Sequence, residues 1–163
     1  MAEERHLYTV LSNLKSNREE TKGALQATTV SLIHDHNKGR ITDILQLGLL
    51  HSLVGLIRCT ADADILYIAL QLLSVLTHGS DEMRLELARM KIVSVLLPLL
   101  TPPQEKSEWE WIPVQEMVLT ALRKITFHCE ANQAAFIKMG GSSLVVKLCK
   151  YDQNKYPPET TER

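Results

Sequence analysis

The side chains with the most chemical potential in this sequence are six histidines and three cysteines. His34 and His36 are the closest pair of histidines, but residues two apart on a helix point in different directions. No Cys-x-x-Cys or His-Glu-x-x-His pattern accompanies them, so the spacing of a zinc site is missing from the sequence. We therefore predict that His34, Asp35 and His36 form a turn after a helix, and we predict no metal site.

The cysteines give no sign of catalysis either. Cys59, Cys129 and Cys149 lie far apart in apolar segments, which is typical of small core residues. Their odd number argues against a disulfide framework and for a reducing compartment, so we expect a cytoplasmic or nuclear protein. Gly140, Gly141 and Ser142 follow a predicted helix and lack the spacing of a phosphate-binding loop. The sequence therefore predicts neither an enzyme nor a cofactor.

Charge and hydropathy exclude two further classes of partner. The chain has 18 Lys and Arg against 19 Asp and Glu, without the basic excess of a nucleic-acid-binding protein. Its longest apolar run, residues 92–100, is interrupted by Ser94 and Pro98 and is far shorter than the roughly 20 residues that cross a bilayer. The N-terminus lacks the basic and apolar regions of a secretory signal. We expect no nucleic acid and no membrane as a partner.

The hydrophobic pattern predicts helices. After Asp64, apolar residues recur at the i, i+3, i+4, i+7 spacing of one helix face: Ile65, Ile68, Ala69, Leu72, Leu73 and Leu76. Asp62 or Asp64 can cap the start of this helix, and Gly79 follows its end. Ser16 and Glu19 have the spacing of a capping box, which predicts that another helix begins at Ser16.

Three segments share an internal register: residues 47–57, 90–100 and 139–149, in which Leu53, Leu96 and Val145 coincide. A second shared element precedes each, at 24–33, 69–78 and 121–130, and a shorter helix is predicted between the two, at 37–48, 80–91 and 132–140. The first repeat distance, from Gly48 to Lys91, is 43 residues, and the second, from Lys91 to Gly140, is 49. The polar insertion 101–113 accounts for the difference.

This unit, with a short first helix ending in glycine before a Leu-Val-x-Leu-Ile helix, resembles the armadillo family over about residues 20–150, and Lys91 departs from the glycine. The resemblance implies an all-α fold: a right-handed α-α superhelix of about three repeats. We expect a domain over residues 1–150, with an N-terminal capping helix at 1–15 and a loop insertion at 101–113, followed by a polar flexible tail at 151–163.

The resemblance also implies a function, because armadillo proteins bind partners along a concave surface lined by their third helices. We therefore expect a non-enzymatic scaffold or adaptor that binds a peptide, a helix or a folded partner. The importin alpha subfamily carries a Trp and an Asn four residues apart on these helices. The corresponding pairs here are Thr28 with Leu32, Gln71 with Val75, and Arg123 with Phe127, so importin-like cargo binding is not expected.

Two interpretations of these positions are open. Leu32, Val75 and Phe127 could accept the apolar face of a partner helix if they are exposed, or they could pack between adjacent repeats. Arg123 and Lys124 add local positive charge that could meet an acidic segment or remain solvated.

The insertion is a second candidate site. Trp109 and Trp111 lie among glutamates in the predicted loop, and tryptophan is enriched at binding hot spots. The alternative is that one of them folds back over a neighbouring helix.

The last predicted unit stops after its second helix, near Lys150. Either the chain is a fragment or short isoform of a longer solenoid, or the exposed edge pairs two chains in a homodimer. The second option makes the protein a structural oligomerisation unit, and a charge at Leu144 or Val145 should then break the dimer.

Overall fold

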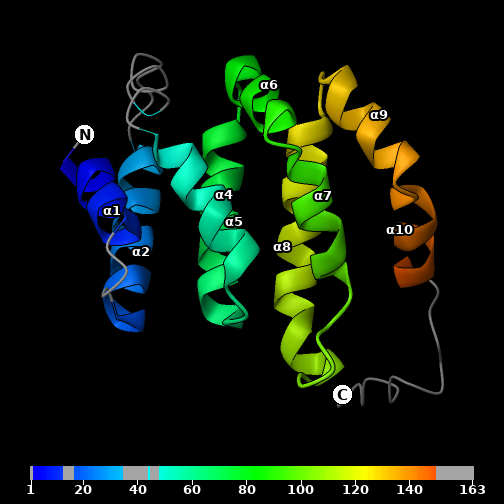
Figure 1. The fold of residues 1–163 in the computed structure, drawn as a ribbon, viewed down its shortest axis with the longest axis horizontal. Coiled ribbons are helices and arrows are strands. Elements are labelled where there is room, and N and C mark those ends of the chain that lie inside the picture. Colours follow the sequence, from blue (N-terminus) through cyan, green and yellow to red (C-terminus); the bar gives the residue numbers. More distant parts are fainter. Residues whose placement is uncertain (1, 13–16, 35–43, 45–47, 150–163) are drawn as a thin grey trace, which may run out of the picture.

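A computed structural model describes residues 2–12, 17–34, 44 and 48–149, and the regular structure of these residues is entirely helical (Figure 1). The helices are α1 (Ala2–Ser12), α2 (Arg18–His34), α4 (Leu49–Cys59), α5 (Ala63–Thr77), α6 (Asp81–Arg89), α7 (Ile92–Leu96), α8 (Glu108–Thr126), α9 (Glu130–Lys138) and α10 (Gly141–Cys149). A 3₁₀ helix, η1 (Leu97–Leu100), continues α7. The prediction of an all-α fold is confirmed.

The helices stand in a row, with α1 and α2 at one end and α9 and α10 at the other (Figure 1). Helix α5 packs against α2 on one side and α8 on the other, and we call these three the third-helix layer. Helix α4 likewise packs against both α1 and α7. One apolar core runs between these two sets of helices, from Leu7 in α1 to Ile125 in α8.

Left-handed turns mark equivalent points of successive units. Gly48, Lys91 and Gly140 stand immediately before α4, α7 and α10, with φ angles of 74°, 55° and 75°. Lys91 therefore adopts the conformation that glycine adopts at the other two turns, although a residue with a Cβ atom strains there by about 1–2 kcal/mol. Gly79 and His128, 49 residues apart, form a second pair, with φ angles of 72° and 48°.

Hydrogen bonds repeat at the same offset. Arg84 Nη1 donates to the carbonyl of Thr77 at 2.9 Å, and Gln133 Nε2 donates to the carbonyl of Thr126 at 2.8 Å. Both acceptors lie at the end of a long helix, where carbonyl groups lack a partner within the helix. In these two units, therefore, the helix after the turn donates a side-chain hydrogen bond to the end of the helix before it. Residues 63–100 and 112–149 are related by an offset of 49 residues.

The insertion is only partly a loop. Ser107 and Glu110 form a capping box, in which Ser107 Oγ accepts from the Glu110 N–H and a Glu110 carboxylate oxygen accepts from the Ser107 N–H, both at 3.2 Å. This cap starts α8 at Glu108, so the irregular segment is 101–107 and the predicted loop boundary at 113 is wrong. The Ser-x-x-Glu signal in the sequence was sufficient to find this helix start.

Other sequence predictions had mixed outcomes. Asp62 caps α5 as predicted, since its side chain accepts from the N–H groups of Asp64 and Ile65. Cys129 is buried, but Cys59 and Cys149 are exposed because each ends a helix at the surface. The predicted starting cap at Ser16, the turn at 35–36, the tail at 151–163, and parts of the capping helix (1 and 13–15) and of the short helix (37–43 and 45–47) lie outside the described residues.

Asn132 joins three helices and provides a test of the packing between units. Its buried side-chain amide donates to the carbonyls of Arg84 at 3.1 Å and Ile125 at 2.9 Å. Asn132→Ala leaves both acceptors without this donor, so we expect the free energy of unfolding to fall by about 1–3 kcal/mol in urea titrations. Gln133→Ala, which removes one exposed hydrogen bond from the same helix, is the matched control. Equal losses for the two variants would contradict the role of Asn132.

Candidate groove on the third-helix layer

The first halves of α2, α5 and α8 enclose a groove with a volume of about 370 Å³. All three helices of the layer contribute side chains, so the groove exists only because the units are stacked. It is lined by Lys22 and Gln26 from α2, by Ala63, Asp64, Tyr67, Ile68 and Gln71 from α5, and by Glu110, Pro113 and Val114 from α8.

The groove combines apolar side chains with hydrogen-bonding groups. Ile68 and Val114 are buried and belong to the core, and Tyr67 is 38% exposed. Gln26 is exposed and Gln71 half-buried, and within the described part of the chain neither side-chain amide makes a hydrogen bond. Each amide can donate and accept at once, as a polypeptide backbone requires.

A cluster of charged side chains joins the starts of α2 and α5 at one end of the groove. The Arg18 guanidinium, at the start of α2, binds the carboxylates of Asp62 and Asp64 at the start of α5, with 2.6 Å between Nη2 and Asp64 Oδ2. Lys22 Nζ lies 3.8 Å from the same Asp64 oxygen. The hydrogen bond from Arg18, helped by the backbone N–H groups of α5, holds the pKa of Asp62 below its usual range and outweighs the opposing effect of burial.

Of the four predicted partner-binding residues on α2 and α5, only one lies in the groove. Gln71 lies in the groove, whereas Thr28 is fully buried and its hydroxyl donates to the carbonyls of Ala24 at 2.9 Å and Glu3 at 3.2 Å. Thr28 therefore cannot contact a partner, and the prediction for it is wrong. Leu32 and Val75 are half-buried, and neither lines the groove.

Gln26 is the residue of α2 that shares the groove with Gln71, and it was not among the predicted site residues. The signal was present, because Gln26 and Gln71 each follow an Ala-Leu pair in the aligned segments 24–33 and 69–78.

The predicted positions on α8 were aligned three residues too far along the helix. The 49-residue offset of the turns and hydrogen bonds makes Thr120 the equivalent of Gln71, and Lys124 the equivalent of Val75. A shift of three residues rotates a helical position by about 60°. Arg123 therefore lines a different cavity, between α8, α9 and α10, and Phe127 is the residue that follows the last turn of α8. Phe127 is 59% exposed, and the Arg84 guanidinium lies 5.7 Å from its ring centre.

The two tryptophans lie in the first turn of α8 and behave differently. Trp111 is only 1% exposed, and its indole N–H donates to the carbonyl of Leu99 at 2.8 Å. Trp111 therefore packs over the end of η1, as in the alternative that one tryptophan folds back over a neighbouring helix. It is not a partner-binding residue. Trp109 is 59% exposed, on a helix rather than on the predicted loop.

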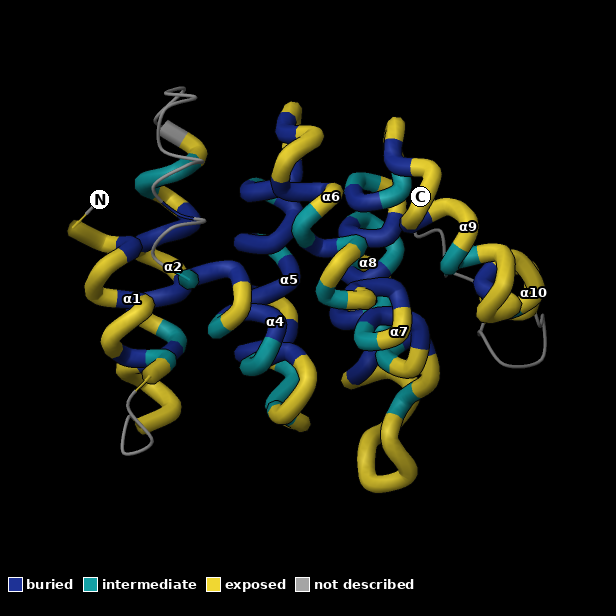
Figure 2. The backbone as a smooth tube through the Cα atoms, turned by 45° about the horizontal axis from the view of Figure 1, so that its top comes forward, coloured by how far each residue is buried: buried dark blue, intermediate teal, exposed yellow. Residues whose placement is uncertain are grey.

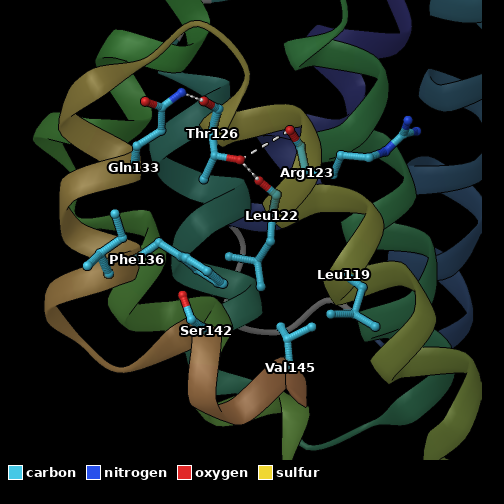
Figure 3. A pocket seen from close by; sticks show the side chains of 9 residues that line it. Leu119, Leu122, Arg123, Thr126, Gln133, Phe136, Ser142 and Val145 are labelled. Atoms are coloured by element: carbon cyan, nitrogen blue, oxygen red, sulfur yellow. Dashed lines mark hydrogen bonds between the residues drawn. The ribbon is translucent and has the colours of Figure 1, made fainter. Parts of the chain in front are cut away.

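A second cavity, of about 510 Å³, lies between α8, α9 and α10 (Figure 3). Helices α9 and α10 are at the opposite end of the row from α1 (Figure 1). We call this cavity the C-terminal slot. Its lining residues come from three helices: Leu119, Leu122, Arg123 and Thr126 from α8, Gln133, Phe136 and Ile137 from α9, and Ser142 and Val145 from α10.

Among the described residues, no group of three or more His, Cys, Asp or Glu side chains is placed to hold a metal ion. In the same part of the chain, no helix combines the length and apolar character needed to span a bilayer.

Comparison with known proteins defines the fold but no family. The sequence matches no protein-family model and no curated protein. The structure is similar to the crystal structure of an engineered protein with a TM-score of 0.70 and 23% identity, over 90% of this chain and 56% of that one. A second engineered protein gives a TM-score of 0.71 and 21% identity, over 91% and 58% of the two chains. This chain thus spans a little over half the length of both engineered proteins.

The ion pair beside the groove predicts a pH-dependent contribution to stability. Asp62→Asn keeps an oxygen to cap α5 but removes the charge that Arg18 binds. The pKa of Asp62 is lower than 3.8 in the folded state, so the ionised carboxylate stabilises the fold at neutral pH. This stabilisation begins to fall as the pH drops below 3.8 and is lost as the pH passes through the lowered pKa. We expect a deficit of roughly 0.2–1 kcal/mol at pH 7. In urea titrations the deficit should shrink on acidification, and a constant deficit would contradict the assignment.

The tryptophans predict a large difference between two similar substitutions. Trp111→Ala should lower the free energy of unfolding by about 3–5 kcal/mol, because it opens a cavity in the core and leaves the Leu99 carbonyl without its donor. Trp109→Ala, two residues away, should change it by less than about 0.5 kcal/mol. Chemical denaturation followed by circular dichroism measures both, and similar effects would show that the burial of Trp111 is wrongly assigned.

Proposed function

We propose that this chain is an armadillo-like solenoid, a right-handed superhelix of about three units, that works as a non-enzymatic protein-interaction scaffold. Its ligand is an extended peptide of a protein partner, bound across the third-helix layer. One observation carries the proposal: the Gln26 and Gln71 amides line one groove beside the apolar side chains of Ile68 and Val114.

The chemistry of the groove suits a peptide. An extended segment presents backbone N–H and C=O groups, and each glutamine can bond one of each. A ligand that covered either amide without pairing it would lose about 1–3 kcal/mol of binding free energy. A backbone that hydrogen-bonds to both glutamines therefore binds better than a purely apolar ligand of the same shape. Ile68 and Val114 can accept one apolar side chain, while Lys22 and Glu110 offer opposite charges on the rims.

The proposed compartment is the cytoplasm or the nucleus. All three cysteines are free, which fits the reducing environment of these compartments. The partner is therefore expected among intracellular proteins that have exposed, unstructured segments.

Peptide selection tests the groove directly. We expect peptides selected from a random library on the immobilised chain to shift the side-chain amide resonances of Gln26 and Gln71 in NMR titrations. The double variant Gln26→Ala and Gln71→Ala should bind them about tenfold more weakly by calorimetry, because two backbone hydrogen bonds are lost.

Gln133→Ala is the matched control, since this exposed glutamine lies on α9, outside the groove. Selected peptides that bind the double variant and the native chain with equal affinity would refute a peptide site at this groove.

A further inference from the structure

The charges along the groove on the third-helix layer are not balanced. Its lining includes one cation, Lys22, and two carboxylates, Asp64 and Glu110. Lys22 Nζ already lies 3.8 Å from an Asp64 oxygen, so its charge is matched within the protein. The neighbouring Arg18 adds no spare positive charge, because its guanidinium binds three carboxylates. The excess charge of the groove is therefore negative.

Glu110 carries this excess. Its carboxylate accepts a hydrogen bond from the Ser107 N–H at 3.2 Å. In the described part of the chain Glu110 makes no ion pair, and Lys106, the cation nearest to it in the sequence, makes none either. Residues 103–110 are all exposed, so a ligand in the groove can reach this carboxylate from solvent (Figure 2).

Apolar side chains lie beside Glu110. Val114 follows it by one turn of α8, and Ile68 lines the same groove from α5. Both are buried members of the core. Tyr67 and Pro113, which also line the groove, are exposed and offer apolar surface to the carbon chain of a lysine or arginine. The groove thus joins an apolar patch to one carboxylate that has no cationic partner among the described residues.

We propose that the groove selects extended peptides in which a lysine or arginine lies within two residues of an apolar side chain. The apolar side chain packs against Ile68 and Val114, and the basic group binds the Glu110 carboxylate. One turn of α8 separates Val114 from Glu110 by about 6 Å along the helix axis, and two residues of an extended chain span a similar length. This proposal rests on the peptide-binding function above and names the class of peptide.

The same charges disfavour an acidic or phosphorylated peptide. A carboxylate or phosphate at the α8 side of the groove would be repelled by Glu110. At the α2 side it would have to displace Asp64 from Lys22. A basic group meets neither obstacle, and its attraction to Glu110 also sets which end of the peptide lies at α8.

The peptides selected on the immobilised chain give the first test. Their sequences should be enriched in lysine or arginine within two residues of an apolar residue. A parallel selection on the variant Glu110→Gln should lose this enrichment, because the charge is gone. Glutamine retains an oxygen that can accept from the Ser107 N–H, so the capping box at the start of α8 is kept and the variant should fold, which circular dichroism checks.

A double-mutant cycle on one selected peptide gives the second test. Replacing its basic residue by glutamine, or Glu110 of the protein by glutamine, should each weaken binding about two- to fivefold in calorimetry at low salt. Both changes together should weaken binding no more than one alone, because they remove the same contact. Glu116→Gln is the matched control, since this exposed carboxylate of α8 lies outside the groove and should leave the preference for the basic peptide unchanged.

The proposal can fail while the peptide site stands. Selected peptides that depend on Gln26 and Gln71 but show no preference for basic residues would remove Glu110 from recognition. Losses that add in the cycle would show that the basic residue binds elsewhere. A dimer in light scattering that the double variant Gln26→Ala and Gln71→Ala converts to a monomer would show that a second copy of this chain fills the groove. If no selected peptide depends on these two glutamines, the proposed function fails as well.

Discussion

The constraint on which this structure depends is that no helix in it can cover its own apolar surface. Helix α5 shows this most clearly, since ten of its 15 residues are buried and they surround the helix instead of forming one stripe. A short helix with so much apolar surface is unstable alone and persists only between neighbours. Here those neighbours are α2, α4 and α8, and the rest of the architecture follows from supplying them.

A stack held together in this way is linear, because each unit contacts only the units beside it. At one end α1 turns Leu7 and Val10 inward, while its other side chains are mostly polar and exposed. At the other end, among the described residues, α9 and α10 have a neighbour on one side only. The asymmetry between the two ends is a direct result of where the apolar residues lie.

The sequence was informative about periodicity and less so about orientation. The alternation of apolar and polar residues located the helices, the Asp62 cap and the turns, including the one at Lys91. It could not fix the rotation of α8, because a leucine-rich helix matches its neighbour almost equally well when it is shifted by three residues. Only the backbone turns and the hydrogen bonds to the Thr77 and Thr126 carbonyls set the register.

The repeat pattern identified only some residues of the candidate groove. Gln71 was identified because α5 lies in the middle of the stack, where the repeat pattern holds on both sides. Thr28 was misplaced because α1 packs over it, and a hydrogen bond to the Glu3 carbonyl has no counterpart in later units. The pairing of Gln26 with Gln71 depends on how α2 and α5 pack, which a single sequence does not specify.

The length of α8 has one more consequence. By the 49-residue offset, the equivalent of α5 begins at residue 112, so α8 extends about 6 Å further, by the four residues 108–111. This additional turn extends beyond the start of α5 and carries Glu110. Glu110 lines the groove from α8, whereas Lys22 lines it from α2. The groove thus has the Lys22–Asp64 pair from α2 and α5 and the Glu110 carboxylate from α8. Because Asp64 balances the charge of Lys22, a basic group of the proposed peptide would be attracted toward Glu110 at the α8 side of the groove.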